Sequence, residues 1–295
     1  MMVLGIAASL LIGVSLGLLG GGGSILTVPL LVYVLGVEPK TAIAMSLLVV
    51  GITSASAVVV HARAGRVRWR TAFVFGGGGM SGAFLGARVA RHVPPGLLLL
   101  LFSAVMVAAA VAMLRRKEAP ALPGVSAGAP VLLSVPRVLA QGAAVGLLSG
   151  LVGAGGGFLI VPALVLGGLS TQAAVGTSLA VISLQCLSGL LGHLGHVQLP
   201  WGLTAAVVGT AVGGSFLGGY FSSRVSPGSL RKGFAVFVLG VACVMAAAQL
   251  PPSIRQGVAP LLATPWPWLG LVGVVGAVTL PYALLLRSHR GKTAE

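Results

Sequence analysis

The sequence predicts an all-α integral membrane protein made of two inverted repeats of transmembrane helices, each opening with a glycine-broken, re-entrant-like helix pair. Composition, internal repetition and the placement of positive charge lead to this prediction. The 295 residues are 57% hydrophobic and only 7% charged, with a mean hydropathy of +1.07. A soluble domain carries about a quarter charged residues. This chain therefore cannot face water on all sides.

The internal repeat is visible in the letters of the sequence. Residues 17–29 read GLLGGGGSILTVP and residues 150–162 read GLVGAGGGFLIVP. Further matches follow at an offset of 132 residues: His61 with His193, Trp69 with Trp201, and Phe102 with Phe234. Two apolar units that each begin with a glycine-broken segment are a layout of many secondary transporters.

Four regions follow from the repeat. We expect a first transmembrane repeat at 1–114, a cytoplasmic linker at 115–136, a second repeat at 137–250, and a C-terminal region at 251–295 with an extra helix and a basic tail. The linker begins with Arg-Arg-Lys-Glu and continues with scattered Pro, Gly and Ser, a composition typical of loops. The N-terminal segment lacks the basic start and cleavage site of a signal peptide, so we expect it in the mature chain.

Nine apolar segments are expected to form the spans, since a helix needs about 20 apolar residues to cross a bilayer. Their ranges are 3–36, 41–61, 71–91, 96–114, 137–169, 172–193, 201–222, 229–250 and 266–286. Segments 3–36 and 137–169 are too long for one ordinary span. A glycine inside a helix costs about 1 kcal/mol relative to alanine, so consecutive glycines should divide each long segment into two half-helices.

Positive charge distinguishes two paths for segment 137–169. If the segment crosses the membrane once, the 18 Lys and Arg residues divide nine to nine between the two faces. If it returns to its starting face, they divide fourteen to four. Cytoplasmic loops carry an excess of Lys and Arg, so the returning hairpin is favoured.

The same path in the first repeat gives three crossings per repeat, and the two repeats are then inverted. This topology places the N-terminus outside and the C-terminus in the cytoplasm of a multi-pass protein of the cell membrane. Segment 3–36 carries no Lys or Arg, so its path rests on symmetry alone. Whether it crosses or returns stays open.

The glycine runs indicate a site. We name residues 20–24 (Gly-Gly-Gly-Gly-Ser) the first glycine break and residues 153–157 (Gly-Ala-Gly-Gly-Gly) the second. Backbone polar groups freed at a break are tolerated in a membrane only within protein or beside a wet cavity, so the two breaks should face each other. Half-helices starting near Ser24 and Gly157 would then direct free N–H groups and positive dipole ends at a small anion.

Polar residues in the following helices could complete this anion site. Ser46 and Ser178 occupy matched positions of the two repeats, Thr177 lies beside Ser178, and Gln185 follows two turns later. Hydroxyl and amide donors suit oxyanions, and a buried amide needs several partners. For each hydroxyl the alternative is a hydrogen bond to its own helix.

Glycines also have a simpler role in membranes, where small residues allow helices to approach closely. That alternative applies to the breaks as well. It is preferred for two pairs with GxxxG spacing, namely Gly82 with Gly86 and Gly214 with Gly218.

Acidic residues are nearly absent, and their absence excludes several functions. Only Glu38, Glu118 and Glu295 are acidic, and all lie outside the expected spans. Proton relays through intramembrane carboxylates and acid-dependent metal or hydrolytic sites are therefore excluded. We predict no catalytic residue, no metal, no cofactor and no enzyme activity. The net charge of +15 lies in short loops, so nucleic acid is not a predicted partner.

Several of these motifs together resemble the TauE/SafE family. They are the two glycine breaks, each followed by Val-Pro, the AMSL and GTSL segments, and the His and Trp residues of the loops. The resemblance extends from about Leu4 to Leu250. Members are described as exporters of sulfite or organosulfur anions. By this resemblance six residues line the pathway: Gly22, Gly23, Ser24, Gly155, Gly156 and Gly157.

These expectations describe a secondary transporter that exports a small anion, sulfite or an organosulfonate, by alternating access of two inverted repeats. A passive channel for small oxyanions is the alternative. The partners are the anionic substrate and the lipid bilayer. The substrate's identity, the coupling ion, the direction of transport and the oligomeric state, a homo-oligomer included, are left open by the sequence.

Overall fold

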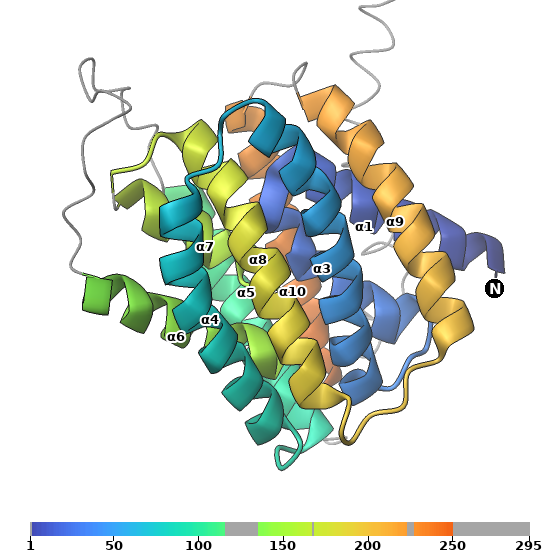
Figure 1. Ribbon diagram of the computed structural model, residues 1–295. Helices are drawn as coiled ribbons and strands as arrows, with labels where there is room; N and C mark the ends of the chain where they lie inside the picture. Colours follow the sequence, from blue (N-terminus) through green and yellow to red (C-terminus); the bar gives the residue numbers. More distant parts are fainter. Residues whose placement is uncertain (1, 116–134, 167, 223–226, 250–295) are drawn as a thin grey trace, which may run out of the picture. The chain divides into compact units, whose positions relative to one another are not determined.

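The structure, a computed structural model, describes residues 2–115, 135–166, 168–222 and 227–249. These residues form ten α-helices with a short 3-10 helix and a short π-helix among them (Figure 1). The predicted all-α class is confirmed. Segment 266–286 and the rest of the C-terminal region lie outside the described residues.

In the first repeat, the helical segments follow the four expected apolar segments, the first of which is divided in two. They are α1 (Met2–Leu19), α3 (Pro39–Arg63), α4 (Trp69–Ala90), α5 (Pro95–Arg115) and, between α1 and α3, a composite stretch. This stretch consists of η1 (Gly20–Leu26), α2 (Thr27–Pro29) and η2 (Leu30–Val34). Helices α3 and α5 begin at proline, whose missing N–H costs nothing in the first turn.

The second repeat contains α6 (Val135–Val152), α7 (Gly157–Leu166), α8 (Thr171–His193), α9 (Trp201–Ser222) and α10 (Pro227–Ala248). Ser170 caps α8 by accepting a hydrogen bond from the Ala173 N–H at 3.4 Å. Such a cap satisfies one of the N–H groups that a helix start leaves unpaired.

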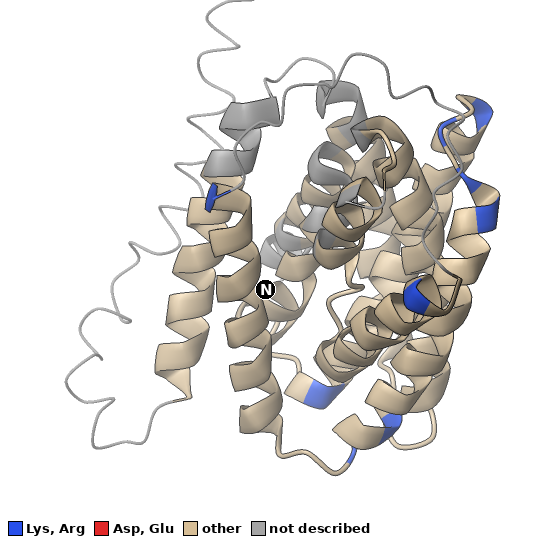
Figure 2. Cartoon of the chain, turned by 90° about the vertical axis from the view of Figure 1, so that its left-hand side faces the viewer, with Lys and Arg blue, Asp and Glu red and all other residues tan. Residues whose placement is uncertain are grey.

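Five of the described helices, α3, α5, α6, α8 and α9, are long and apolar enough to cross a membrane. Figure 2 shows Lys and Arg at the ends of helices and in loops, with the helix middles free of them. This distribution is typical of transmembrane helices, because a charge at the bilayer centre is costly.

The chain divides into two compact units. The first contains residues 1–102 and 119–224, and the second contains residues 103–118 and 225–295. Every predicted site residue lies in the first unit, which includes α1 to α4 and α6 to α9. The second unit includes the later part of α5 and all of α10.

Within the first unit, glycines bring helices of different repeats into backbone contact. Helix α6 packs along α4, and α1 packs along α9. A methyl group added at Gly82 or Gly86 would lie 2.1 or 2.2 Å from a main-chain oxygen of α6, and one at Gly214 would lie 2.6 Å from the Leu10 oxygen. No side chain fits at these positions, so the packing role predicted for these three glycines is confirmed.

Helices α3 and α8 lie side by side and run in opposite directions (Figure 1). Near the start of α3, Leu47 meets Gly189 late in α8, and Gly51 meets Cys186. At the end of α3, His61 lies beside Gly176, which is early in α8. Contacts along the pair therefore run in reverse order.

Helices α4, α6 and α8 share one direction. Gly76 meets Leu184, and further along both helices Ala87 meets Gly192, so α4 and α8 run the same way. Gly142 lies against the Phe75 oxygen, and Gly150 lies against that of Ala83. Helix α6 therefore follows α4 in the same sense.

Candidate functional site

The second glycine break interrupts the helix in the way the sequence predicts. Helix α6 ends at Val152 and α7 starts at Gly157. Between them Gly153, Gly155 and Gly156 have φ angles of 76°, 65° and 68°. Other residues pay about 1–2 kcal/mol for this left-handed conformation, which explains why glycine occupies these positions.

The first glycine break has a different local structure, and the half-helix expected near Ser24 is present as an apolar helical stretch of mixed type, Gly23–Val34. The chain tightens into the 3-10 helix η1 from Gly20 to Leu26, and only three α-helical residues precede the π-helix η2. Glycine permits a left-handed turn but does not require one. Pro29 follows shortly, but its counterpart Pro162 lies inside the α-helix α7, so proline alone does not explain the mixed helix type.

The two breaks are in direct contact, as predicted. Ser24 Oγ donates a hydrogen bond to the Ala154 carbonyl at 2.5 Å, which joins residues 130 positions apart. From α3, Ser46 Oγ donates to the Gly153 carbonyl at 2.6 Å. Both serines are fully buried. Their hydroxyls hold carbonyl groups that the break has released from the helix.

The other predicted hydroxyls have different partners. Thr177 Oγ1 accepts a hydrogen bond from the Arg68 N–H at 3.0 Å, which ties the loop before α4 to α8. Ser178 Oγ donates to the Val175 carbonyl of its own helix at 2.8 Å. Ser178 therefore follows the own-helix alternative. Of the first-break glycines, Gly22 lies in η1, and Gly23 packs so closely that an added methyl would lie 2.3 Å from the Ser15 main chain.

Gln185 lies beside the second break, and its carboxamide has no hydrogen-bond partner among the residues that the structure describes. The side chain is completely buried, and neither Nε2 nor Oε1 is bonded. It fills the space between Gly79 of α4 and Gly156, since methyl groups added at these glycines would lie 2.2 Å from Nε2 and 3.3 Å from Oε1. The carboxamide thus lies at the start of α7.

Ser149 completes this group and was not predicted from the sequence. Its Oγ is buried and has no hydrogen-bond partner within the described part of the chain, and its Cβ lies 3.5 Å from the position of a methyl group on Gly156. We name Gln185, Ser149 and Gly156 the Gln185 cluster. A signal was available, because Ser149 shares one face of α6 with Gly146 at the helical spacing of three residues.

Histidines and cations lie at the end of α8. His193 Nε2 lies 2.9 Å from the Gly150 carbonyl, in the last turn before the second break, and its ring lies 5.4 Å from that of His196. Lys40 Nζ donates to the Arg91 carbonyl at 2.8 Å. Partial burial lowers the pKa of His196, and the positive charges of Arg91 and Lys40 lower it further.

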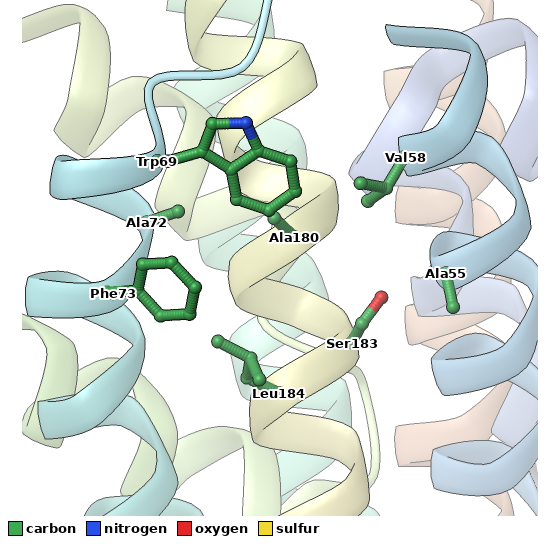
Figure 3. A pocket seen from close by; sticks show the side chains of 8 residues that line it. All are labelled: Ala55, Val58, Trp69, Ala72, Phe73, Ala180, Ser183 and Leu184. Carbon is green, nitrogen blue, oxygen red and sulfur yellow. The ribbon is translucent and has the colours of Figure 1, made fainter. Parts of the chain in front are cut away.

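A shallow apolar groove of about 200 Å³ lies between α3, α4 and α8. Figure 3 shows its walls, with Trp69 and Phe73 of α4 facing α8 and the smaller residues of α3 opposite. Its polar side chain, Ser183, bonds to the Leu179 carbonyl of its own helix. None of the predicted site residues lines this groove.

The buried helix breaks and the apolar helices define a multi-pass membrane protein with irregular backbone enclosed in protein. The chain belongs to the TauE/SafE sulfite exporter family, whose sequence pattern it matches over residues 5–245, with a second match over 138–292. The resemblance seen in the sequence is thereby confirmed. The family is one of membrane transporters and not of enzymes.

Relatives from distant organisms carry similar names. A probable membrane transporter protein of Xylella fastidiosa is 36% identical over 236 residues, which cover 79% of this chain and 90% of the relative. The probable membrane transporter protein YdhB of Bacillus subtilis is 26% identical, covering 77% and 92% of the two chains. A Methanocaldococcus jannaschii relative of the same description is 28% identical, covering 77% and 88%. No solved structure matches the chain.

Proposed function

We propose that this protein is a secondary transporter that exports a small anion, sulfite or an organosulfonate, by alternating access of two inverted repeats. The observation that carries the proposal is the contact of two helix breaks in the buried centre of one unit, through Ser24 and Ala154. Transporters commonly bind substrate where discontinuous helices of two repeats meet.

Reciprocal helix contacts support two structurally equivalent repeats. An added methyl at Gly146 would lie 2.1 Å from the Gly79 oxygen, and one at Gly13 would lie 2.1 Å from the Ala211 oxygen. Gly146 corresponds to Gly13 in the sequence repeat, and Gly79 corresponds to Ala211. The same contact therefore occurs twice, with the two repeats exchanged. The first helix of each repeat packs on the corresponding later helix of the other repeat, α6 on α4 and α1 on α9, as two-fold symmetry requires.

The direction of the helices supports inversion. The corresponding helices α3 and α8 pack against each other in opposite directions. A two-fold axis along the membrane normal would make such a pair parallel. An antiparallel pair instead needs an axis in the membrane plane, which is the axis of inverted-topology repeats.

The path of the second break supports the returning hairpin. Helices α6 and α8 both run in the direction of α4. The segment between them, which includes α7, must therefore lead back to the end at which α6 begins. The end of the first unit that holds residues 63–70 carries four arginines, and the positive-inside rule makes it cytoplasmic.

The site itself suits an anion without any buried cation. The start of α7 supplies unpaired N–H groups and a positive dipole end. We place Gly155, Gly156, Gly157 and Gln185 next to the anion, with Ser24 and Ser46 fixing the carbonyls of the break. The other predicted residues are proposed to support the pathway: Gly22, Gly23, Thr177 and Ser178. The family description names sulfite, which is the first substrate to test.

The test is flux of labelled sulfite in proteoliposomes with and without an imposed pH gradient. We expect gradient-driven flux in the wild type and none in Gly155→Leu, because a side chain there would meet Val50 at 2.7 Å. The matched control is Gly77→Leu in α4, since no atom of the described residues lies within 4 Å of a methyl group at Gly77. Size-exclusion chromatography of each variant checks folding.

Three results would contradict parts of the proposal. Flux that no proton or sodium gradient can drive uphill would indicate a passive anion channel. Equal flux in Gly155→Leu and wild type would move the site away from the second break. Folded wild type that moves neither sulfite nor any sulfonate would contradict an anion transporter of this class.

A further inference from the structure

The two repeats are unequal at the Gln185 cluster. Gln185 corresponds to Thr53 in the first repeat, and Thr53 Oγ1 bonds to the Val49 carbonyl of its own helix at 2.7 Å. Ser149 corresponds to Leu16, a buried apolar residue. At these two positions the first repeat has no unpaired polar group, and its buried hydroxyls without a partner are instead those of Thr27 and Ser54.

Three buried polar atoms without hydrogen-bond partners lie close together here, and such a group indicates a ligand. Gln185 Nε2, Gln185 Oε1 and Ser149 Oγ are all buried, and all three lack partners. A buried polar atom without a hydrogen bond has lost its hydration without compensation, which destabilises the fold. Native proteins leave few such atoms, and those that remain often mark a site.

The hydroxyls around the cluster are already engaged. Ser24 and Ser46 hold carbonyl groups of the break, and Ser178 bonds within its helix. At the second break, the donors left for a ligand are the Gln185 amide, the Ser149 hydroxyl and the N–H groups at the start of α7. The two ends of a carboxamide exchange by rotation about its terminal bond, so the amide can present its NH₂ group to Gly156.

We propose that Ser149, Gln185 and the start of α7, all in the second repeat, form a binding subsite for one singly charged oxyanion group, a sulfonate or hydrogen sulfite. This inference rests on the proposed function and assigns its substrate contacts. No Lys or Arg belongs to the subsite, so only neutral donors and a helix dipole offset the anion's desolvation.

Charge selectivity follows from these neutral donors. The cost of moving an ion out of water grows with the square of its charge, so a dianion costs about four times as much as a monoanion of the same size. A subsite without a cation discriminates against the second charge. Methanesulfonate should therefore bind where sulfate does not, although both present oxygen atoms arranged around sulfur.

The experiment measures KM and maximal rate for labelled sulfite in proteoliposomes containing wild type, Gln185→Leu, Gln185→Glu or Ser149→Ala. We expect KM to rise about ten-fold or more in Gln185→Leu and several-fold in Ser149→Ala, since each loses a hydrogen bond to a charged group. Gln185→Glu should lose flux, because it places an anion beside the substrate. Methanesulfonate should compete with sulfite in the wild type and sulfate should not.

The matched control is Ser81→Ala in α4, whose hydroxyl bonds to the Gly78 carbonyl of its own helix. Its KM should equal that of wild type. An unchanged KM in both Gln185→Leu and Ser149→Ala, with only the amount of folded protein reduced, would make the cluster structural and overturn the subsite. Equal competition by sulfate would overturn its charge selectivity. In both cases, flux of sulfite in the wild type would still support the proposed transport function. A wild type that moves none of these anions would contradict both the transport function and the subsite.

Discussion

The first and second glycine breaks have similar sequences but different backbone structures. In the second, three glycines turn left-handed and a new α-helix begins at Gly157. In the first, the chain stays helical by tightening into η1. The difference shows that a glycine run lowers the cost of a break without deciding its form, which depends on the neighbours. Here Ser46 holds the Gly153 carbonyl, while its counterpart Ser178 bonds within its own helix.

The largest expected effect comes from one substitution made in both breaks. Gly153→Ala places a side chain at a φ of 76° and within 3.0 Å of the Ile43 main chain. The left-handed conformation alone costs about 1–2 kcal/mol, and crowding adds to it. Its counterpart Gly20 lies in the 3-10 helix η1, a structure whose negative φ suits any residue, so Gly20→Ala should avoid the left-handed cost.

Thermal unfolding of the two variants in detergent measures this difference. Wild type and Gly20→Ala should unfold at similar temperatures, with Gly153→Ala well below them. Equal losses in both variants would mean that the two breaks share one backbone structure, and the contrast between them would fail.

A smaller effect should separate the matched serines. Ser46→Ala leaves the buried Gly153 carbonyl without its 2.6 Å hydrogen bond, which costs roughly 1–3 kcal/mol. Ser178→Ala removes a bond to a carbonyl of its own helix, so it should cost less. The free energy of unfolding of both variants, compared with wild type, tests this order. The reverse order would show that Ser178 is the residue that supports the site.

The smallest expected effect concerns the loop after α8. His196 corresponds to Ala64 in the first repeat. Partial burial and the charges of Arg91 and Lys40 lower the pKa of His196 below its ordinary value of 6.5. Between the folded and unfolded pKa the unfolded chain binds more protons, so this contribution to stability is complete above pH 6.5 and is lost as the pH falls.

Melting temperatures at neutral pH and at about pH 5 measure this contribution. Wild type should lose more stability on acidification than His196→Gln, which cannot take up the proton. Identical pH profiles of the two proteins would show that His196 titrates alike in the folded and unfolded states.

Sequence reasoning predicted the parts of the fold that depend on local composition. The segment expected at 201–222 is α9 (Trp201–Ser222), and the start of α7 at Gly157 followed from the glycines before it. Apolar length and glycine propensity determine such features locally. The form of the first break could not be predicted in this way, because η1 depends on packing against the Ser15 main chain and on Ala154, 130 residues from Ser24.

The candidate site was predicted less completely than the fold. Gln185 was identified because a buried amide needs partners. Ser149 was missed because a serine in a glycine-rich helix looks like a packing residue. Thr177 was expected beside the anion, but it accepts a hydrogen bond from Arg68. Which hydroxyl is left without a hydrogen-bond partner depends on contacts between helices. The sequence of one repeat does not contain that information.

The first helix of each repeat packs against a helix of the other repeat, and this packing has a consequence for biosynthesis. Helix α1 packs on α9, and its Gly13 contacts Ala211. Helix α1 is therefore synthesised almost two hundred residues before this partner. During that interval its glycine face meets lipid or the insertion machinery. Neither half of this chain contains its own complete interior, and assembly of the first half is finished by the second.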